Sequence, residues 1–132
     1  MNISKFTQKS IQAINQLEKV AYDFGNQEIE LEHLLYSLLH QEDSLILKLV
    51  EKMEINKEHF LNRLEGFIGK RVKVSGGQPY VGQYLNKVLI NAEDEAKVMG
   101  DEYVSVEHLF LSILKNESPS MKQFFREYGI TR

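Results

Sequence analysis

Two Glu-His pairs, Glu32-His33 and Glu107-His108, are the residues of this sequence best suited to do chemistry. Carboxylates and imidazoles serve as metal ligands and as general acids or bases. Neighbouring residues of a helix point about 100° apart, so one pair cannot chelate one ion well. The zinc-protease pattern of two histidines four residues apart does not occur. We interpret each pair as part of the first turn of a helix, where glutamate favours the macrodipole and histidine packs at the rim of the core. A metal-dependent hydrolase that joins the two pairs is the alternative.

No other motif indicates catalysis. The segment 75–79 lacks the Gly-Lys-Ser/Thr ending of a phosphate-binding loop. The chain has no cysteine, which excludes disulfides and a thiolate nucleophile. We therefore predict a binding domain that is not an enzyme, with no catalytic residue, no metal and no cofactor of its own.

Size and composition predict one folded domain, 1–132. The net charge of −3 argues against nucleic acid as a partner, because phosphate binding needs a basic face. The start of the chain lacks the apolar run of a signal peptide, and no stretch is apolar enough to span a membrane. We expect a cytoplasmic protein that binds neither nucleic acid nor membrane.

The chain contains two copies of one unit. Matching residues are separated by a constant 75 positions, as in Glu32 and Glu107 (107 − 32 = 75). The same offset relates Ala21 to Ala96, Gly25 to Gly100, Ser37 to Ser112 and Ile55 to Ile130. Since chance matches would not keep one offset through two helices and their turn, the repeat is a property of the fold.

Apolar residues at helical spacing predict the same order of helices in both copies. The first helices run from Phe6 to Phe24 and from Leu85 to Met99, and each ends at a glycine suited to a left-handed turn. The second helices begin near Leu31 and Val106, the third after Ser44 and Ser118, and a fourth after Asn56. Ser105 is a good N-cap, whereas its counterpart Glu30 is a poorer one.

The sequence thus predicts an all-α fold of two tandem four-helix repeats, residues 4–68 and 80–132, packed about a pseudo-twofold axis. The second copy stops where the first begins its fourth helix. We therefore expect that helix to be truncated and the chain to be an excerpt of a longer one. The segment 69–79 between the copies carries Lys70, Arg71 and Lys73. We predict a solvated linker, with an anion or RNA contact as the alternative.

A shallow apolar groove between the repeats is the candidate binding site. Ile11 and Ile90 lie at the shoulders of their apolar stripes, and Thr7 shares the face of Ile11. We expect the two long helices to pack together and to line a groove for peptide segments with Tyr80, Val81 and Tyr103, rimmed by Asp101 and Glu107. Alternatively, these residues complete the core or are singly exposed.

These residues resemble the Clp N-terminal repeat domain. The resemblance rests on Phe6-Thr7 with the helix after it and on segments 26–35 and 100–110, and it covers essentially the whole chain. Segments 41–43 and 101–111 are most similar to the ClpB branch. The resemblance implies a mobile helical module of a hexameric AAA+ disaggregase that binds ATP and magnesium in its motor and works with the DnaK system. It implies that the module engages unfolded or aggregated polypeptides, with Thr7, Asp101 and Glu107 at positions tied to substrate binding.

The ClpC branch of the same family implies an alternative function. There, the glutamate of each Glu-His motif lies in a pocket for phosphorylated arginine, which corresponds to Glu32 and Glu107 in this sequence. A domain of that kind would recognise adaptors or modified arginine for a protease unfoldase, rather than apolar segments.

Overall fold

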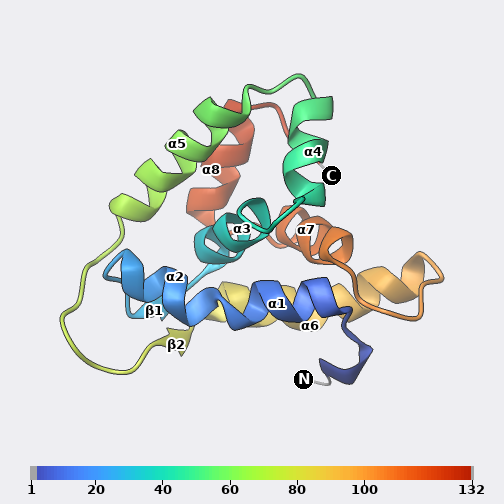
Figure 1. The fold of residues 1–132 in the computed structure, drawn as a ribbon, viewed down its shortest axis with the longest axis horizontal. Coiled ribbons are helices and arrows are strands. Elements are labelled where there is room, and N and C mark those ends of the chain that lie inside the picture. Colours follow the sequence, from blue (N-terminus) through green and yellow to red (C-terminus); the bar gives the residue numbers. More distant parts are fainter. Residues whose placement is uncertain (1–2, 132) are drawn as a thin grey trace.

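The computed structural model describes residues 3–131 of the chain. Helices dominate it, as predicted, together with two strands of two residues each (Figure 1). The elements are η1 (Ile3–Lys5), α1 (Gln8–Asn15), α2 (Leu17–Asp23), β1 (Glu28–Ile29), α3 (Leu31–Leu39), α4 (Leu45–Lys52), α5 (Lys57–Gly69), β2 (Tyr80–Val81), α6 (Gln83–Val98), α7 (Val106–Lys115) and α8 (Pro119–Glu127). No helix within this range is long and apolar enough to cross a membrane.

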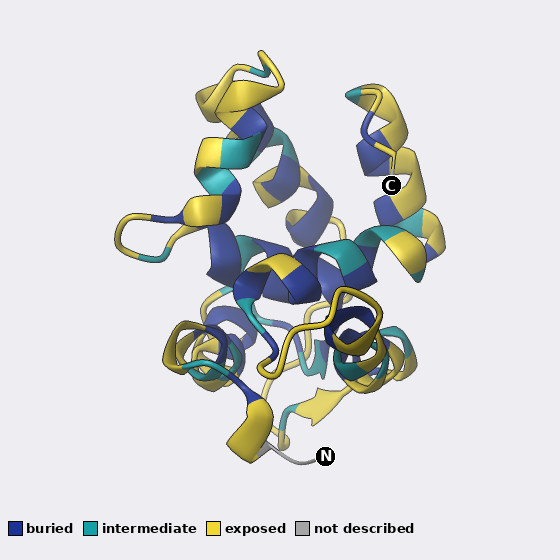
Figure 2. Ribbon diagram, turned by 90° about the vertical axis from the view of Figure 1, so that its right-hand side faces the viewer, coloured by how far each residue is buried: buried dark blue, intermediate teal, exposed yellow. Residues whose placement is uncertain are grey.

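Helices α3 and α7 form the centre of the fold. Nearly every residue of α3 is buried, and α7 exposes little beyond Glu107 and Lys115 (Figure 2). Helices α1, α2 and α6 lie on one side of this central pair, while α4, α5 and α8 lie on the other (Figure 1). The fourth helix of the first repeat, α5, packs on α8 of the second through the rings of Phe60, Phe67 and Phe124. The two repeats therefore share one core.

Matched contacts in the two halves confirm the internal repeat. The hydroxyl of Ser37 donates to the carbonyl of Ala13 over 2.8 Å, and that of Ser112 donates to the carbonyl of Val88 over the same distance. Each bond links the centre of the fold to a long helix, and 75 positions separate the equivalent partners. A buried hydroxyl needs such an acceptor, and the equivalent long helix supplies it in both copies.

The two small parallel pairings of the backbone also obey the offset of 75. Ile29 pairs with Val81 in the β1–β2 sheet, and Phe6 pairs with Val104 in an isolated bridge. Adding 75 to Phe6 gives Val81, and adding 75 to Ile29 gives Val104. Both pairings join one repeat to the other, which is the expected pseudo-twofold arrangement.

The expected helix boundaries are largely confirmed. Ser44, Asn56 and Ser118 each accept a backbone N–H three residues ahead, as N-caps do. Gly25 and Gly100 have φ angles of 75° and 73°, which a side chain would strain. The predicted boundaries thus rest on local interactions that are present in the folded chain.

Two expectations about the long helices are wrong. The first helix is interrupted at Gln16, although hydrogen bonds from Gln16 to Gln12 and from Val20 to Gln16 continue across the break. The interruption is therefore a kink. Moreover, α1 and α6 pack mainly on α3 and α7 instead of on each other (Figure 2). The central helices are apolar nearly all round, so they occupy the centre and hold the amphipathic helices at its flanks.

Candidate functional site

The pseudo-twofold axis gives the molecule two equivalent ends. We define the Gly25 end as residues 24–32 together with the linker and β2. We define the Gly100 end as residues 99–107 together with residues 5–7. In Figure 1 the two ends lie at opposite ends of α6. The helix has 16 residues and is therefore about 24 Å long.

The Gly100 end is held by backbone bonds between the repeats. The Thr7 N–H donates to the Val104 carbonyl over 2.9 Å, and the Val104 N–H donates to the Lys5 carbonyl over 2.8 Å. The hydroxyl of Thr7 also accepts the Ser10 N–H and caps α1. Thr7, which was predicted to bind substrate, thus has a structural role next to Tyr103.

His108 fixes the polar part of this end. Its Nδ1 accepts the N–H of Ser105, and its Nε2 donates to Asp101 over 2.9 Å. Asp101 is half-exposed, so its carboxylate is oriented while solvent still reaches it. The neighbouring Glu107 is exposed, and it has no ion-pair partner among residues 3–131. Tyr103 is 51% exposed. These side chains form an open surface of carboxylates and an aromatic ring.

The Gly25 end is closed by a carboxylate that crosses between the repeats. Glu30 is buried and accepts the N–H groups of Leu85, over 2.7 Å, and of Tyr84, over 3.2 Å. It thereby caps α6, whose own N-cap residue, Gly82, has no side chain. Burial raises the pKa of the Glu30 carboxyl above its ordinary value, and the two amide donors offset only part of this rise. A Cβ on Gly82 would lie 2.4 Å from this carboxyl group. A side chain at position 82 would therefore displace the Glu30 carboxyl from the start of α6.

Glu32 is held by the linker. Its Oε2 accepts a 2.8 Å ion-pair hydrogen bond from Arg71 and a 3.1 Å hydrogen bond from Ser120, and its side chain is 1% exposed. Arg71 also donates to Glu28 over 2.7 Å. Residues 69, 70 and 72–78 of the linker are exposed, as expected of a solvated linker, whereas Arg71 departs from that expectation because the buried carboxylate of Glu32 needs a cation. The exposed Lys70 and Lys73 lie beside it.

The first-turn interpretation of the Glu-His pairs is confirmed. His33 repeats the His108 arrangement: its Nδ1 accepts the Glu30 N–H, and its Nε2 lies 2.9 Å from the Asn26 oxygen. Burial, and then the Arg71 cation, lower the pKa of His33 to about 4. Both ring nitrogens of each histidine are engaged locally, which argues against the hydrolase alternative. Within residues 3–131, no group of three His, Cys, Asp or Glu side chains is placed to hold a metal.

The predicted groove residues do not form one cluster. Thr7, Asp101, Tyr103 and Glu107 gather at the Gly100 end, whereas Tyr80 lies in β2 at the other end of α6. Ile90, on α6 between the ends, is 53% exposed. Val81 lies in β2 beside Tyr80 and is 49% exposed, whereas Ile11 is half-buried against the core. Whether these residues bind substrate stays a prediction.

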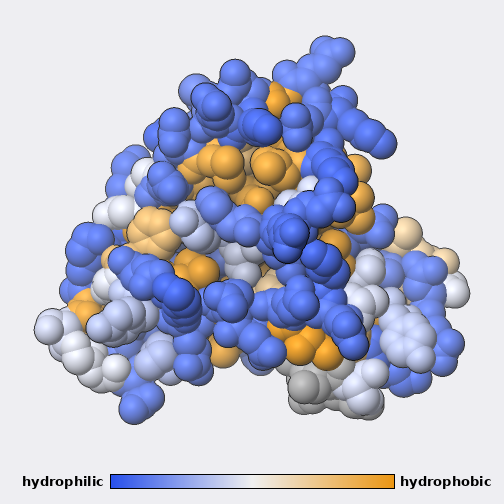
Figure 3. Space-filling model, viewed as in Figure 1, coloured by the Kyte–Doolittle hydropathy of each residue, from blue (hydrophilic) through white to orange (hydrophobic). Residues whose placement is uncertain are grey.

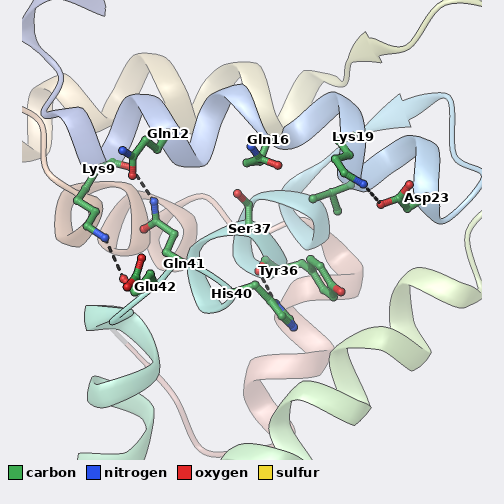
Figure 4. A pocket seen from close by; sticks show the side chains of 11 residues that line it. Lys9, Gln12, Gln16, Lys19, Asp23, Tyr36, Ser37, His40, Gln41 and Glu42 are labelled. Carbon is green, nitrogen blue, oxygen red and sulfur yellow. Dashed lines mark hydrogen bonds and ion pairs between the residues drawn. The ribbon is translucent and has the colours of Figure 1, made fainter.

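Sequence reasoning missed a polar cavity between α1–α2 and α3 (Figure 4). Gln12, Gln16 and Gln41 contribute amides to it, and the stacked rings of Tyr36 and His40 form one wall. The available signal was the i, i+4 spacing of Gln12 with Gln16 and of Tyr36 with His40. Polar residues at that spacing on a helix usually face solvent, so the spacing alone does not predict a cavity. In the second repeat, a hydrogen bond between Asn91 and Asn116, the counterparts of Gln16 and Gln41, joins the equivalent helix α6 to the end of α7.

The face shown in Figure 3 is mostly hydrophilic, with a broad apolar area between α4 and α5 and smaller apolar patches elsewhere. Leu45 and Met53 at the ends of α4 are 40% and 43% exposed. This second feature also lies outside the predicted groove. The surface thus offers apolar contacts at more than one place.

Comparison with known proteins identifies the fold. Residues 5–128 match the Clp repeat (R) N-terminal domain family. The chain belongs to this family. It is 41% identical, over its whole length, to the chaperone protein ClpB of Nitratidesulfovibrio vulgaris strain Hildenborough, and it spans 16% of that protein.

Solved structures agree with this membership. The Hsp104 N-terminal domain of Candida albicans superposes with a TM-score of 0.82 at 22% identity, covering 96% of this chain and 83% of that one. A ClpV N-domain solved in complex with a VipB peptide superposes with a TM-score of 0.73 at 17% identity, covering 94% and 79%. At these identities the likeness establishes the Clp N-domain fold alone.

Proposed function

We propose that this chain is the substrate-binding N-terminal module of a ClpB-type chaperone and that it binds exposed apolar segments of unfolded or aggregated polypeptides. The observation that carries the proposal is the Gly100 end with the last residue of α6 before it, where Val98, Met99 and Tyr103 expose large apolar side chains near the carboxylates of Asp101 and Glu107. Large apolar side chains that are exposed close to one another favour a binding site, and these three lie within six residues of the chain. The ClpV N-domain complex gives a precedent for peptide binding on this fold.

The module is proposed to act for an attached motor. Similarity to ClpB supports a cytoplasmic AAA+ hexamer as that motor, with ATP and magnesium bound there and the DnaK system as its partner. Burial of about 300 Å² at roughly 25 cal/mol per Å² contributes about 7 kcal/mol before ordering costs. The expected affinity is therefore micromolar or weaker, which suits a module that releases what it hands over.

An amide NMR titration with unfolded casein tests the proposal. We expect shifts around Thr7, Ile90, Asp101 and Glu107, and we expect Ile90→Asp to weaken binding while the fold survives, because Ile90 is half-exposed. Ile11→Asp is a poorer test, since Ile11 packs against the core.

The matched control is Asn62→Asp, which makes the same charge change at an exposed position of α5, on the far side of α3 from α6 (Figure 1). The proposal fails if casein shifts none of these amides at millimolar concentration. The placement of the groove is wrong if Ile90→Asp and Ile11→Asp both bind casein as the unmodified chain does.

A second candidate function is recognition of phosphoarginine, in the manner of a ClpC-type unfoldase. The exposed, unpaired Glu107 favours it at the Gly100 end. At the Gly25 end, the Glu32 carboxylate already forms an ion pair with Arg71. Free phosphoarginine should then shift amides near Glu107 alone, and Glu107→Ala should abolish the shifts. Absence of both effects removes this candidate.

A further inference from the structure

The polar cavity between α1–α2 and α3 is large enough to hold a ligand. Its volume is about 640 Å³, within the range of about 300–1,000 Å³ that is usual for ligand pockets. It runs along the two helices from Lys9 to Asp23 (Figure 4). Asp23 lies 14 positions after Lys9, which corresponds to about 21 Å of helix. An extended chain rises about 3.3 Å per residue, so a segment of about six residues matches this length.

The amide side chains of the cavity are available to a ligand. Gln12 and Gln16 lie on one wall, and Gln41 faces them from just after α3 (Figure 4). Among residues 3–131, the side-chain amides of Gln12 and Gln16 form no hydrogen bond. Gln41 donates one N–H to the Lys9 carbonyl over 2.8 Å, which leaves its oxygen and its second N–H. Each of the three amides therefore presents both a donor and an acceptor to the cavity.

The equivalent place in the second repeat is bridged by its own side chains. Asn91 and Asn116, the counterparts of Gln16 and Gln41, are each one methylene group shorter, and they bond to each other over 3.1 Å. Since these two amides satisfy each other, they are not offered to a ligand. The open arrangement is thus a property of the first repeat and does not follow from the fold that the two repeats share.

We propose that this cavity binds the backbone of an extended, uncharged segment of unfolded polypeptide. Side chains four residues apart on a helix are separated by about 6 Å, and alternate peptide groups of an extended chain by about 6.6 Å. Gln12 and Gln16 therefore pair with two peptide groups on one edge of the segment, while Gln41 pairs with the other edge. The inference rests on the proposed function for its ligand, and it adds a second site that does not select apolar side chains.

The charges and walls of the cavity favour a neutral polypeptide. The charged residues that line it are two cations and two anions, Lys9, Lys19, Asp23 and Glu42. This balance gives no net attraction for a phosphate or another strongly charged ligand. The stacked rings of Tyr36 and His40, with centroids 3.9 Å apart, add a flat wall against which a side chain of the segment packs. Hydrogen bonds to the main chain do not depend on sequence, which suits a module that meets many unfolded polypeptides.

The probe is a capped hexapeptide of alternating threonine and serine, which has neither charges nor large apolar side chains. Titrated into the labelled chain and followed by NMR, it should shift the side-chain amide signals of Gln12, Gln16 and Gln41. A second hexapeptide, with N-methyl groups on alternate backbone nitrogens, lacks the donors of one edge. It should bind about fivefold more weakly or worse, the effect of one or more lost hydrogen bonds.

Variants of the chain locate the contact. Gln16→Leu keeps a side chain of similar size but removes its amide, and it should weaken binding of the hexapeptide about threefold or more. The matched control is Gln123→Leu, which makes the same change at an exposed position of α8, on the other side of α3, and should leave binding unchanged (Figure 1). The double variant Gln16→Asn/Gln41→Asn copies the Asn91–Asn116 bond of the second repeat, so it should close the cavity and abolish the shifts. None of the three changed positions is buried, so the variants should fold.

Three results would overturn the inference. The first is equal binding of the two hexapeptides, which would show that the backbone donors are not recognised. The second is an equal effect of Gln16→Leu and Gln123→Leu. The third is the absence of any shift in the cavity at tens of millimolar hexapeptide.

Casein in a parallel titration distinguishes this inference from the proposed function. Casein shifts at the Gly100 end without shifts in the cavity would leave the proposed function standing and refute the second site. Casein shifts in the cavity alone would support the second site and remove the Gly100 end as the place where substrate binds. Shifts at both places, of which the double variant loses those in the cavity, are the expected result.

Discussion

Removing the Arg71 guanidinium should destabilise the domain strongly. In Arg71→Ala, the carboxylate of Glu32, which is 1% exposed beneath Arg71, keeps only the Ser120 hydroxyl as a donor. Its Oε1 already has no hydrogen-bond partner among the described residues. Breaking a buried ion pair from one side costs about 3–5 kcal/mol, and the 20% exposure of Arg71 places this pair near the lower end, at about 3 kcal/mol.

This loss of stability corresponds to a large fall in melting temperature. An unfolding entropy of about 2.1 cal/mol/K per residue gives about 0.28 kcal/mol/K for 132 residues, so about 3 kcal/mol lowers Tm by about 10 °C. Thermal unfolding followed by circular dichroism measures this change directly. The matched control is Lys73→Ala, which removes an exposed cation of the same linker that donates to the Phe24 carbonyl.

A double variant tests the cause of the loss. In Arg71→Ala/Glu32→Gln, the stranded charge is gone, so part of the lost stability should return, about 1 kcal/mol or more. If Arg71→Ala lowers Tm no more than Lys73→Ala does, or if the second substitution restores nothing, the buried pair does not hold the linker in place and the reasoning is refuted.

Two further predictions concern Glu30 and His33. Gly82→Ala should lower the free energy of unfolding by about 2 kcal/mol, because the added Cβ displaces the Glu30 carboxyl from the start of α6. The control is Gly66→Ala in α5, where an added Cβ meets no atom within 4 Å. This control should be neutral or should stabilise the domain by up to about 1 kcal/mol. Urea unfolding compares the two, and equal losses would contradict the role of Glu30. His33 should titrate near pH 4 by NMR, since burial and then Arg71 lower its pKa from 6.5. Its neutral form therefore contributes stability that is present above about pH 6.5 and is lost as the pH falls towards 4, because the unfolded chain then binds the extra proton. Asn26→Asp, which places a carboxylate 2.9 Å from Nε2, should raise this pKa, and an unchanged titration would show that the ring does not face residue 26.

The sequence alone determined the repeat and the local structure of the domain. The offset of 75, the helical spacing of apolar residues, and caps such as Asn56 and Ser118 are properties of neighbouring residues. Helix ends and left-handed turns depend on a few adjacent groups, so they can be predicted from one sequence. The same locality explains why each Glu-His pair was correctly placed in a first helical turn.

Only the tertiary structure decided what each copy of a repeated residue does. Glu32 and Glu107 are both followed by His-Leu in the sequence, yet Glu32 is buried beneath Arg71 and Glu107 is exposed. Glu30 is a poor cap for its own helix, but it caps α6 in the other repeat, because Gly82 leaves room for it. Both outcomes depend on the contacts of residues that lie 39 to 55 positions apart in the chain. Periodicity and spacing carry no information on such contacts, since the free energy of a charge depends on what the fold brings within hydrogen-bonding distance of it.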